Sequence, residues 1–290
     1  NSGTMENIEN TGEISGSGTG NINASGDGFG YGIYNKSGTI GDITNTGVIY
    51  GKDNAIKNDS GTIGIVDNYG ILATQGDSVI KGTIGTEKNY GLYIGKDGKI
   101  TVGTEKLGDD SIKVVVGYTE DGKEIVKDMT IKNATLNGDS GSATSTVSFE
   151  FKGEAGKYDN SILNGKDETL KVSEGNHELK DSIINAYETA VVMGSNDSTL
   201  ILNNTVVNGG ILGNDPTIRI TGSQNILTIQ GNSVVNGTME STGENNTLNF
   251  SGNDENGINI MHKISGFSNM NIGENTNVTL FEKNIGAKGE

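Results

Sequence analysis

The sequence contains no cysteine and no tryptophan, and it has one proline, Pro216, and one arginine, Arg219. Without cysteine the chain has neither a disulfide framework nor a thiolate metal site, and this absence fits an exported protein that avoids thiol oxidation. Aromatic residues make up only 5% of the 290 residues, whereas the sequence contains 46 glycines and 36 asparagines. A single large globular core is therefore not expected.

Positive charge is also scarce. The chain carries 21 basic and 37 acidic residues, which gives a formal net charge of -16. Phosphate backbones and anionic lipid headgroups would be repelled, and a single arginine cannot supply the bidentate base contacts that sequence readers of DNA use. These properties exclude nucleic acid and anionic membrane surfaces as expected partners.

Long hydrophobic runs are missing as well. Runs such as Val114–Val116 fall far short of the roughly 20 apolar residues that a membrane-spanning helix needs. No signal peptide is visible, and Asn1 already lies inside a repeat, so we expect a fragment whose targeting segments lie outside it. The low hydrophobicity of 32% together with the net charge also matches disordered chains, but the repeats argue against disorder.

Internal repeats are the strongest feature of the sequence. Ser37–Ile49 (SGTIGDITNTGVI) recurs as Ser60–Leu72 (SGTIGIVDNYGIL), and the offset between the two copies is about one rung of a solenoid. Further copies begin at Gly82, Ser2 and, in degenerate form, Ser17. A flexible low-complexity stalk remains an alternative, although such a linker would not keep isoleucine at equivalent positions in successive copies.

A second repeat runs through the C-terminal half. Five hexamers of the type NSVVNG begin at positions 133, 160, 181, 204 and 232, so they recur at a similar but less regular spacing. Strand-like stretches lie between them, for example Thr199–Leu202 and Ile226–Ile229. Each period therefore holds two or three short β runs bounded by turn residues.

The repeats predict an all-β fold, a right-handed parallel β-helix of about 12 rungs. A unit of two or three short strands cannot bury its own apolar face, but coiling stacks each strand on its counterpart in the next turn. Aligned asparagines (Asn45, Asn68 and Asn89) can form amide ladders, and we expect Gly47, Gly70 and Gly91 to supply corners with positive φ. A β-sandwich or barrel is the other open alternative.

Residues 101–158 interrupt the pattern, so we expect three parts: a β-helix over 1–100, irregular rungs with a protruding hairpin or small insertion over 101–158, and a β-helix over 159–290. The apolar stretches around Asp121-Gly122 predict a hairpin. Insertions on solenoids often carry binding, so the candidate binding residues are Tyr118, Glu120, Asp121 and Lys123. An irregular pair of rungs without a role in binding is the alternative.

Catalytic chemistry finds little support. Gly138–Ser142 matches the segment around the nucleophile of chymotrypsin-like proteases. In that family the histidine that acts as the base precedes the serine in the chain, whereas both histidines here, His177 and His262, follow Ser140. Glycan cleavage needs two facing carboxylates; the candidates are Asp197, Asp215 and Asp254, for which surface turns are the preferred interpretation. Gly26-Asp27-Gly28 and Asp109-Asp110 offer oxygen ligands for calcium, but the repeat of calcium-binding solenoids is absent. We expect no enzyme, no cofactor and no metal.

The repeat SGTIGxIxNxGxI at 37–49 and 60–72 resembles the passenger regions of large type V autotransporter adhesins, particularly the fusobacterial type. The segments Asn246–Gly252, Ile264–Phe267 and Val278–Leu280 are similar to their later rungs. The resemblance covers most of the chain outside 101–158. It implies a parallel β-helix displayed outside a bacterial outer membrane and a C-terminal β-barrel translocator outside this fragment.

The resemblance also implies attachment to host or microbial cells through a surface protein or glycan. The sequence leaves two other hypotheses open: a passive β-helical spacer that holds a distal binding head, and a glycan-cleaving β-helix enzyme. No feature of the sequence names the ligand or the face that binds it.

Overall fold

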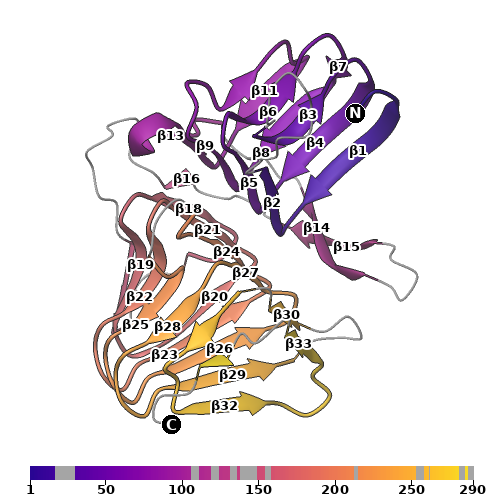
Figure 1. The fold of residues 1–290 in the computed structure, drawn as a ribbon. Helices are drawn as coiled ribbons and strands as arrows, with labels where there is room; N and C mark the ends of the chain where they lie inside the picture. The colour runs from indigo at the N-terminus through magenta and orange to yellow at the C-terminus, as the bar shows by residue number, and fades with distance from the viewer. Residues whose placement is uncertain are drawn as a thin grey trace. The chain divides into compact units, whose positions relative to one another are not determined.

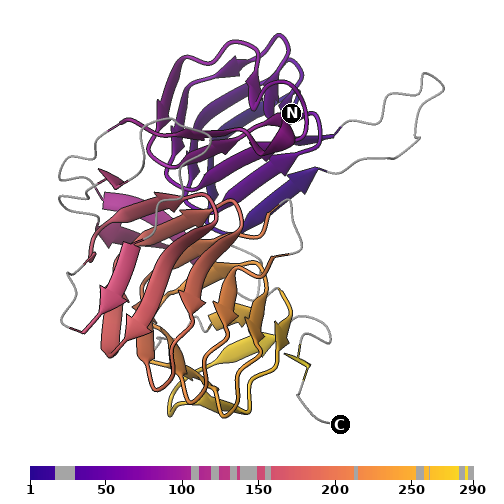
Figure 2. The same cartoon turned by 90° about the vertical axis from the view of Figure 1, so that its left-hand side faces the viewer.

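The computed structural model describes residues 1–16, 30–105, 111–118, 124–130, 136–137, 149–153, 158–211, 215–252, 258–260, 262–280 and 285–286. These residues are almost all strand or turn, with one short 3-10 segment, η1 (Lys96–Gly98). They divide into two compact units, a first unit over residues 1–105 and a second unit formed by the described residues from 111 onward. Each unit is built of short strands stacked turn upon turn (Figures 1 and 2).

The first unit has three sheets. Sheet A joins the parallel strands β1 (Thr4–Asn10), β4 (Thr39–Asn45), β7 (Thr62–Ile63), β8 (Ile65–Asn68) and β11 (Thr86–Asn89). Sheet B joins the parallel strands β2 (Glu13–Gly16), β5 (Val48–Gly51), β9 (Ile71–Thr74) and β12 (Leu92–Ile94), with β13 (Ile100–Val102) antiparallel to β12 at its edge. Sheet C joins β3 (Tyr31–Asn35), β6 (Asn54–Asn58) and β10 (Ile80–Lys81).

The second unit has three large parallel sheets and two small ones. Sheet D is the antiparallel pair β14 (Ser111–Tyr118) and β15 (Glu124–Thr130). Sheet E joins β16 (Leu136–Asn137), β18 (Ile162–Gly165), β21 (Ile183–Ala186), β24 (Val206–Asn208) and β27 (Val234–Asn236).

Sheet F joins β17 (Phe149–Lys152), β19 (Glu168–Glu174), β22 (Thr189–Met193), β25 (Ile218–Ile220), β28 (Met239–Ser241), β31 (Ile264–Ser265) and β34 (Ile285–Gly286). Sheet G joins β20 (Asn176–Lys180), β23 (Thr199–Asn203), β26 (Ile226–Gln230), β29 (Thr247–Ser251) and β32 (Asn269–Ile272). Sheet H pairs β30 (Ile258–Ile260) with β33 (Val278–Leu280) in parallel.

The fold is a parallel β-solenoid, as the repeats predicted. Equivalent positions of successive copies pair directly, so that Ile40 lies beside Ile63 and Ile183 beside Val206. The expected number of about 12 rungs was too high. The described strands make about eight complete turns, three in the first unit and five in the second, because β13, β14 and β15 pair antiparallel instead of adding rungs.

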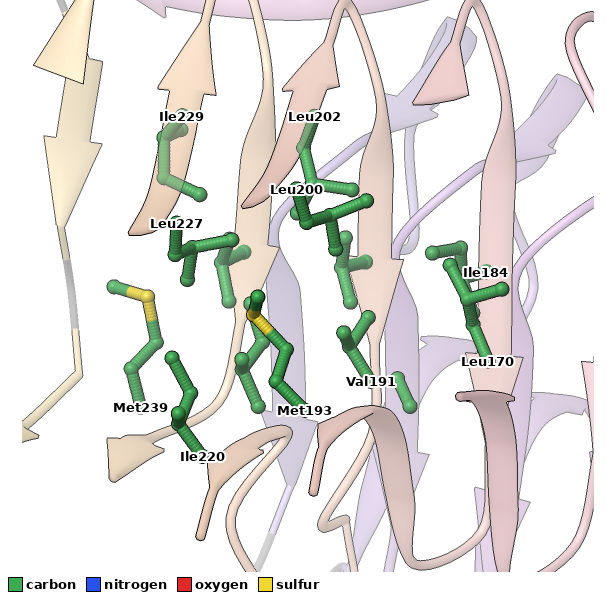
Figure 3. Close-up of a cluster of buried hydrophobic side chains, with 14 of the residues drawn as sticks. Leu170, Ile184, Val191, Met193, Leu200, Leu202, Ile220, Leu227, Ile229 and Met239 are labelled. Carbon is green, nitrogen blue, oxygen red and sulfur yellow. The ribbon is translucent and has the colours of Figure 1, made fainter. Parts of the chain in front are cut away.

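Each unit has its own apolar core. In sheet G the inward residues Leu200, Leu202, Leu227 and Ile229 are fully buried, and they stack in columns against inward residues of sheets E and F (Figure 3). Burial of one such aliphatic side chain contributes about 1.5–3 kcal/mol. The first unit has a separate cluster that includes Ile40, Ile63 and Ile56. Stacked aliphatic columns therefore replace the single large core that the composition excluded.

Buried asparagines form the predicted amide ladder. In the first unit, Asn10 Nδ2 donates to Asn45 Oδ1 (2.8 Å), Asn45 Nδ2 to Asn68 Oδ1 (2.7 Å) and Asn68 Nδ2 to Asn89 Oδ1 (2.8 Å). The same side chains also donate to turn carbonyls such as Gly47 O. Since an unpaired buried amide is costly, every copy of the repeat must keep an asparagine at this position for its neighbours to remain satisfied.

The expected role of Gly47, Gly70 and Gly91 was wrong. None of the three has a positive φ. Instead, a Cβ added at Gly70 would lie 2.1 Å from Gly47 O, and one at Gly91 would lie 2.0 Å from Gly70 O. Glycine is required because successive turns approach each other too closely for a side chain, which is the other use of this residue.

The expected hairpin is present as β14 and β15, whose pairing runs from Ser111 with Thr130 to Tyr118 with Glu124 and contains an irregularity between Val115 and Gly117. Within the part of the chain that the structure describes, no helix is long and apolar enough to cross a membrane.

Candidate binding surfaces

Two tyrosines, a lysine and an aspartate meet on sheet C; we call these residues, Tyr31, Tyr34, Lys57 and Asp59, the sheet C cluster. The tyrosine rings lie 5.1 Å apart at an angle of 47°. Lys57 Nζ lies over both, 4.6 Å from the centroid of Tyr31 and 5.3 Å from that of Tyr34. It also donates to Tyr31 Oη (3.0 Å). The strands hold this arrangement in place because Tyr34 pairs directly with Lys57 across β3 and β6.

The carboxylate of Asp59 completes the cluster. Tyr34 Oη donates to Asp59 Oδ2 (2.5 Å), and Lys57 Nζ lies 3.2 Å from Asp59 Oδ1. The hydrogen bond from Tyr34, assisted by Lys57, lowers the pKa of the Asp59 carboxyl and raises the pKa of Tyr34. The hydrogen bond with Tyr31 and the contact with Asp59 raise the pKa of Lys57 despite its partial burial. The cluster therefore presents an ammonium, a carboxylate and the neutral phenol of Tyr34 at neutral pH, beside the ring of Tyr31.

These groups suit the recognition of another surface. Tyrosine combines a large apolar ring with a polar tip, and it is enriched where binding energy concentrates. The Asp59 side chain is 40% exposed, whereas that of Lys57 is 16% exposed. The Lys57 ammonium is thus held in place by the tyrosine rings and by its hydrogen bonds. A ligand would therefore bind groups that are already ordered.

This cluster was not predicted from the sequence, because Tyr31 and Lys57 are 26 residues apart. The signal was nevertheless available. The offset from Tyr34 to Lys57 equals the offset between the two best copies of the repeat, which begin at Ser37 and Ser60. Placing one copy above the other, residue by residue, would have brought the ring and the ammonium together.

A second polar surface lies on sheet F and consists of ion pairs. Glu168 accepts from Arg219 Nη2 (2.7 Å) and contacts Lys171 Nζ (2.8 Å). Lys171, followed by Arg219, lowers the pKa of Glu168, whereas burial and the nearby acids Asp167 and Asp215 raise the pKa of Glu188. The charged form of Glu168 is therefore favoured by its ion pairs, which belong to an ordinary surface network, whereas the charged form of Glu188 is disfavoured.

The hairpin residues predicted as a binding site are only partly described. Tyr118 is the last residue of β14 and pairs with Glu124 of β15. Glu120, Asp121 and Lys123 lie outside the described residues, so this site stays a prediction.

The other candidates for chemistry are scattered. Asp197 lies in an exposed turn with a φ of 57°, and Asp215 lies 3.8 Å from Arg219 Nη1. His177 stacks on Phe151 with ring centroids 4.8 Å apart. Ser140, Asp254, Asp27 and the pair Asp109-Asp110 lie outside the described residues. Among the residues that the structure describes, no group of three or more His, Cys, Asp or Glu could hold a metal ion.

Comparison with known proteins identifies no relative. No protein-family model matches the chain, and no curated protein or solved structure matches it either. The function must therefore be argued from the fold and from the side chains that the fold presents.

Proposed function

We propose that this chain is a segment of a cell-surface adhesin that attaches to a protein or glycan on a host or microbial cell. The sheet C cluster is the observation that carries the proposal. Two stacked strands hold its rings and ions on a regular scaffold, and a binding surface gains affinity when its groups need no ordering on contact.

The resemblance of the SGTIGxIxNxGxI repeat to autotransporter passengers extends the proposal to location. The segment would be displayed on the outer surface of a bacterial outer membrane, with a β-barrel translocator located C-terminal to it in the complete protein. The parallel β-solenoid is consistent with such a passenger. In this proposal the chain is not an enzyme, and release of reducing sugar from polysaccharides incubated with it would contradict that part.

Cell binding tests the proposal. The labelled 290-residue chain is added to cultured epithelial cells and to bacteria, and bound label is measured by flow cytometry. Lys57→Met removes the ammonium and keeps the aliphatic stem, and Tyr34→Leu removes the phenol. We expect Lys57→Met to weaken binding by at least about tenfold, since hydrogen bonds to charged groups contribute roughly 1.5–3 kcal/mol, and Tyr34→Leu to weaken it by about fivefold, since a neutral hydrogen bond contributes about 1 kcal/mol.

Lys88→Met is the matched control. Lys88 lies on β11 of sheet A in the same unit, and the substitution removes one positive charge, as Lys57→Met does. Its binding should equal that of the unaltered chain. Deletion of residues 104–128 tests the hairpin in the same assay: loss of binding there alone would move the site to Tyr118, Glu120, Asp121 and Lys123. Circular dichroism checks that each variant keeps its β structure.

A passive spacer is the second candidate function. The continuous columns of paired strands and the amide ladder favour it, because they are features of a stiff rod and require no ligand. Absence of binding by the unaltered chain, with binding by a neighbouring segment of the full-length protein, would support the spacer.

A further inference from the structure

The outer face of sheet G carries no charge across four successive strands. Its outward positions form three columns that run from β23 to β32. The first column contains Thr199, Ile226, Thr247 and Asn269, and the second contains Ile201, Thr228, Asn249 and Asn271. The third, shorter column contains Asn203, Gln230 and Ser251. Strand geometry makes this face about 13 Å wide and about 14 Å high.

This lack of charge distinguishes the outer face of sheet G from the outward columns of sheets A, C and F. The chain is 20% charged with a net charge of -16. The corresponding column on sheet F contains Lys171, Arg219 and Glu240, sheet A has Asp67 and Lys88, and sheet C has Lys57. On sheet G the charges, Glu178 and Lys180, occur only on the first strand, β20.

The polar groups of this face are aligned with one another. Asn271 Nδ2 donates to Asn249 Oδ1 (2.9 Å), and Asn249 Nδ2 points to Thr228 Oγ1 (3.5 Å). Asn269 Nδ2 likewise points to Thr247 Oγ1 (3.5 Å). Amide and hydroxyl groups both donate and accept hydrogen bonds, so the face presents both kinds of group on successive rungs, with Thr228 itself buried beneath its neighbours at 9% exposure.

Two apolar side chains, Ile201 and Ile226, interrupt the polar lattice. Ile226 is 38% exposed, which makes it one of three large hydrophobic side chains exposed among the described residues. Its inward neighbour Leu227 is fully buried. Together with the half-exposed Ile201 of β23, Ile226 therefore adds apolar contact to a face whose other side chains are hydroxyls and amides.

We propose that the outer face of sheet G binds a neutral, hydroxyl-rich polysaccharide. An anionic or cationic polymer would lose hydration at this face without meeting an opposite charge, whereas sugar hydroxyls can exchange their hydrogen bonds with water for bonds to amides and hydroxyls. The C–H groups of the sugar ring would contact Ile226. A repeating lattice also favours a repeating ligand.

A protein partner fits this face less well. Protein interfaces concentrate their binding energy in Trp, Tyr and Arg, and none of these residues occurs in the three columns. With few strong contacts per sugar, affinity must come from many sugars of one chain binding together. The proposal concerns the second unit, so it stands or fails independently of the sheet C cluster.

Native gel electrophoresis of the 290-residue chain tests the proposal. Soluble neutral polymers, a β-glucan and a galactomannan, are cast into separate gels, and mobility is compared with that in a gel without polymer. We expect at least one polymer to retard the chain. Thr247→Lys and Asn249→Asp should each weaken the retardation by about tenfold, since each places a charge on the face. A short oligosaccharide should compete only at much higher concentration than the polymer.

Thr44→Lys is the matched control, because Thr44 is an outward, half-exposed threonine of β4 on sheet A. It should be retarded like the unaltered chain. The proposal is overturned if no neutral polymer retards the chain, if heparin retards it instead, or if Thr247→Lys and Thr44→Lys behave alike. It is also overturned if sedimentation shows self-association that Thr247→Lys abolishes, because a second copy would then occupy the face.

Discussion

Two small residue types set the spacing of the solenoid. Asparagine satisfies the turn carbonyls and the next asparagine, and glycine leaves room for the next turn. In the column of Gly12, Gly47, Gly70 and Gly91, each glycine after the first lies against a carbonyl oxygen of the preceding turn. A Cβ at Gly12 would meet nothing within 4 Å, so one column contains both constrained and unconstrained positions.

This contrast predicts the effects of two alanine substitutions. Gly70→Ala would place a Cβ 2.1 Å from Gly47 O, and forcing the turns apart should lower the free energy of unfolding by about 3 kcal/mol. Gly12→Ala should change it by less than about 0.5 kcal/mol. Urea unfolding monitored by tyrosine fluorescence measures both, since the chain has no tryptophan. Equal effects of the two variants would contradict the close-approach explanation.

The sequence predicted the asparagine ladder correctly and the role of the glycines incorrectly. For Asn45 and Asn68, the offset between copies of the repeat and the chemistry of an amide are enough, because stacked amides have one favourable partner. For Gly70, the repeat shows that no side chain is tolerated, but the same pattern results from a positive φ and from a crowded turn. Only coordinates distinguish these two causes.

The two glutamates on sheet F should respond to pH in opposite directions. The pKa of Glu168 is lowered from its ordinary 4.5 in the folded state, so its ion pairs stabilise the protein above that value and are lost as pH falls through the lower one. The pKa of Glu188 is raised, mainly by burial. The charged Glu188 carboxylate therefore destabilises the folded protein at neutral pH. This destabilisation is lost as pH falls through the raised pKa and the carboxyl becomes protonated.

Glutamine variants test these signs. At about pH 7, Glu168→Gln should lower the melting temperature and Glu188→Gln should raise it, each by the equivalent of less than about 1 kcal/mol because both sites are well solvated. Both differences should shrink as pH falls: the Glu188→Gln difference is lost first, and the Glu168→Gln difference is lost only as pH falls through the lowered pKa of Glu168. Thermal melts followed by circular dichroism measure both, and a Glu168→Gln effect that persists in acid would show that its packing, not its charge, matters.

At the scale of the strand, the edge of sheet B is closed by an antiparallel strand. After β12 the chain turns through η1, where Asp97 and Gly98 have positive φ, and β13 pairs back on β12 from Leu92 with Val102 to Ile94 with Ile100. Parallel edges carry unpaired backbone groups that can recruit another chain. The returning strand covers this edge, so β13 is a cap.

The cap predicts a difference between two neighbouring residues. Ile100 is 9% exposed, whereas Thr101, the next residue of β13, is exposed. Ile100→Lys should detach β13 and destabilise the first unit by about 2 kcal/mol, and the freed edge of β12 should cause self-association. Thr101→Lys should leave both properties unchanged. Analytical ultracentrifugation measures the association, and a monomeric Ile100→Lys chain that keeps its stability would refute the capping role.

The sequence predicted some elements better than others. Parallel stacking followed from the repeats, and the hairpin followed from Asp121-Gly122, because both depend on local patterns. The cap β13 was missed because a three-residue strand has too little periodicity to reveal whether it continues the stack or turns back. The sheet C cluster was missed because its residues come from different turns and belong to no motif.

At the scale of the whole molecule, the chain lies in two units, each with its own axis of stacked strands. The described rungs contact mainly the rungs before and after them, unlike the layers of a globular domain. Stability should therefore be a sum of local terms along each axis. The same arrangement lets outward faces differ, as the aromatic cluster of sheet C and the uncharged face of sheet G do, while the inward columns stay aliphatic.

A substitution in the middle of one stack tests this local stability. Leu227 is fully buried on β26 between Leu200 of β23 and Leu248 of β29, and Leu227→Ala should cost about 2–5 kcal/mol through the cavity it leaves. Hydrogen exchange measured by mass spectrometry should show the largest loss of protection in β23, β26 and β29, and a smaller loss in β18. Ile226→Ala, on the exposed face of the same strand, should change little. If each rung is coupled only to its neighbours, the loss of protection should decrease with each rung away from Leu227. A uniform loss across the second unit would show instead that its turns unfold as one cooperative body.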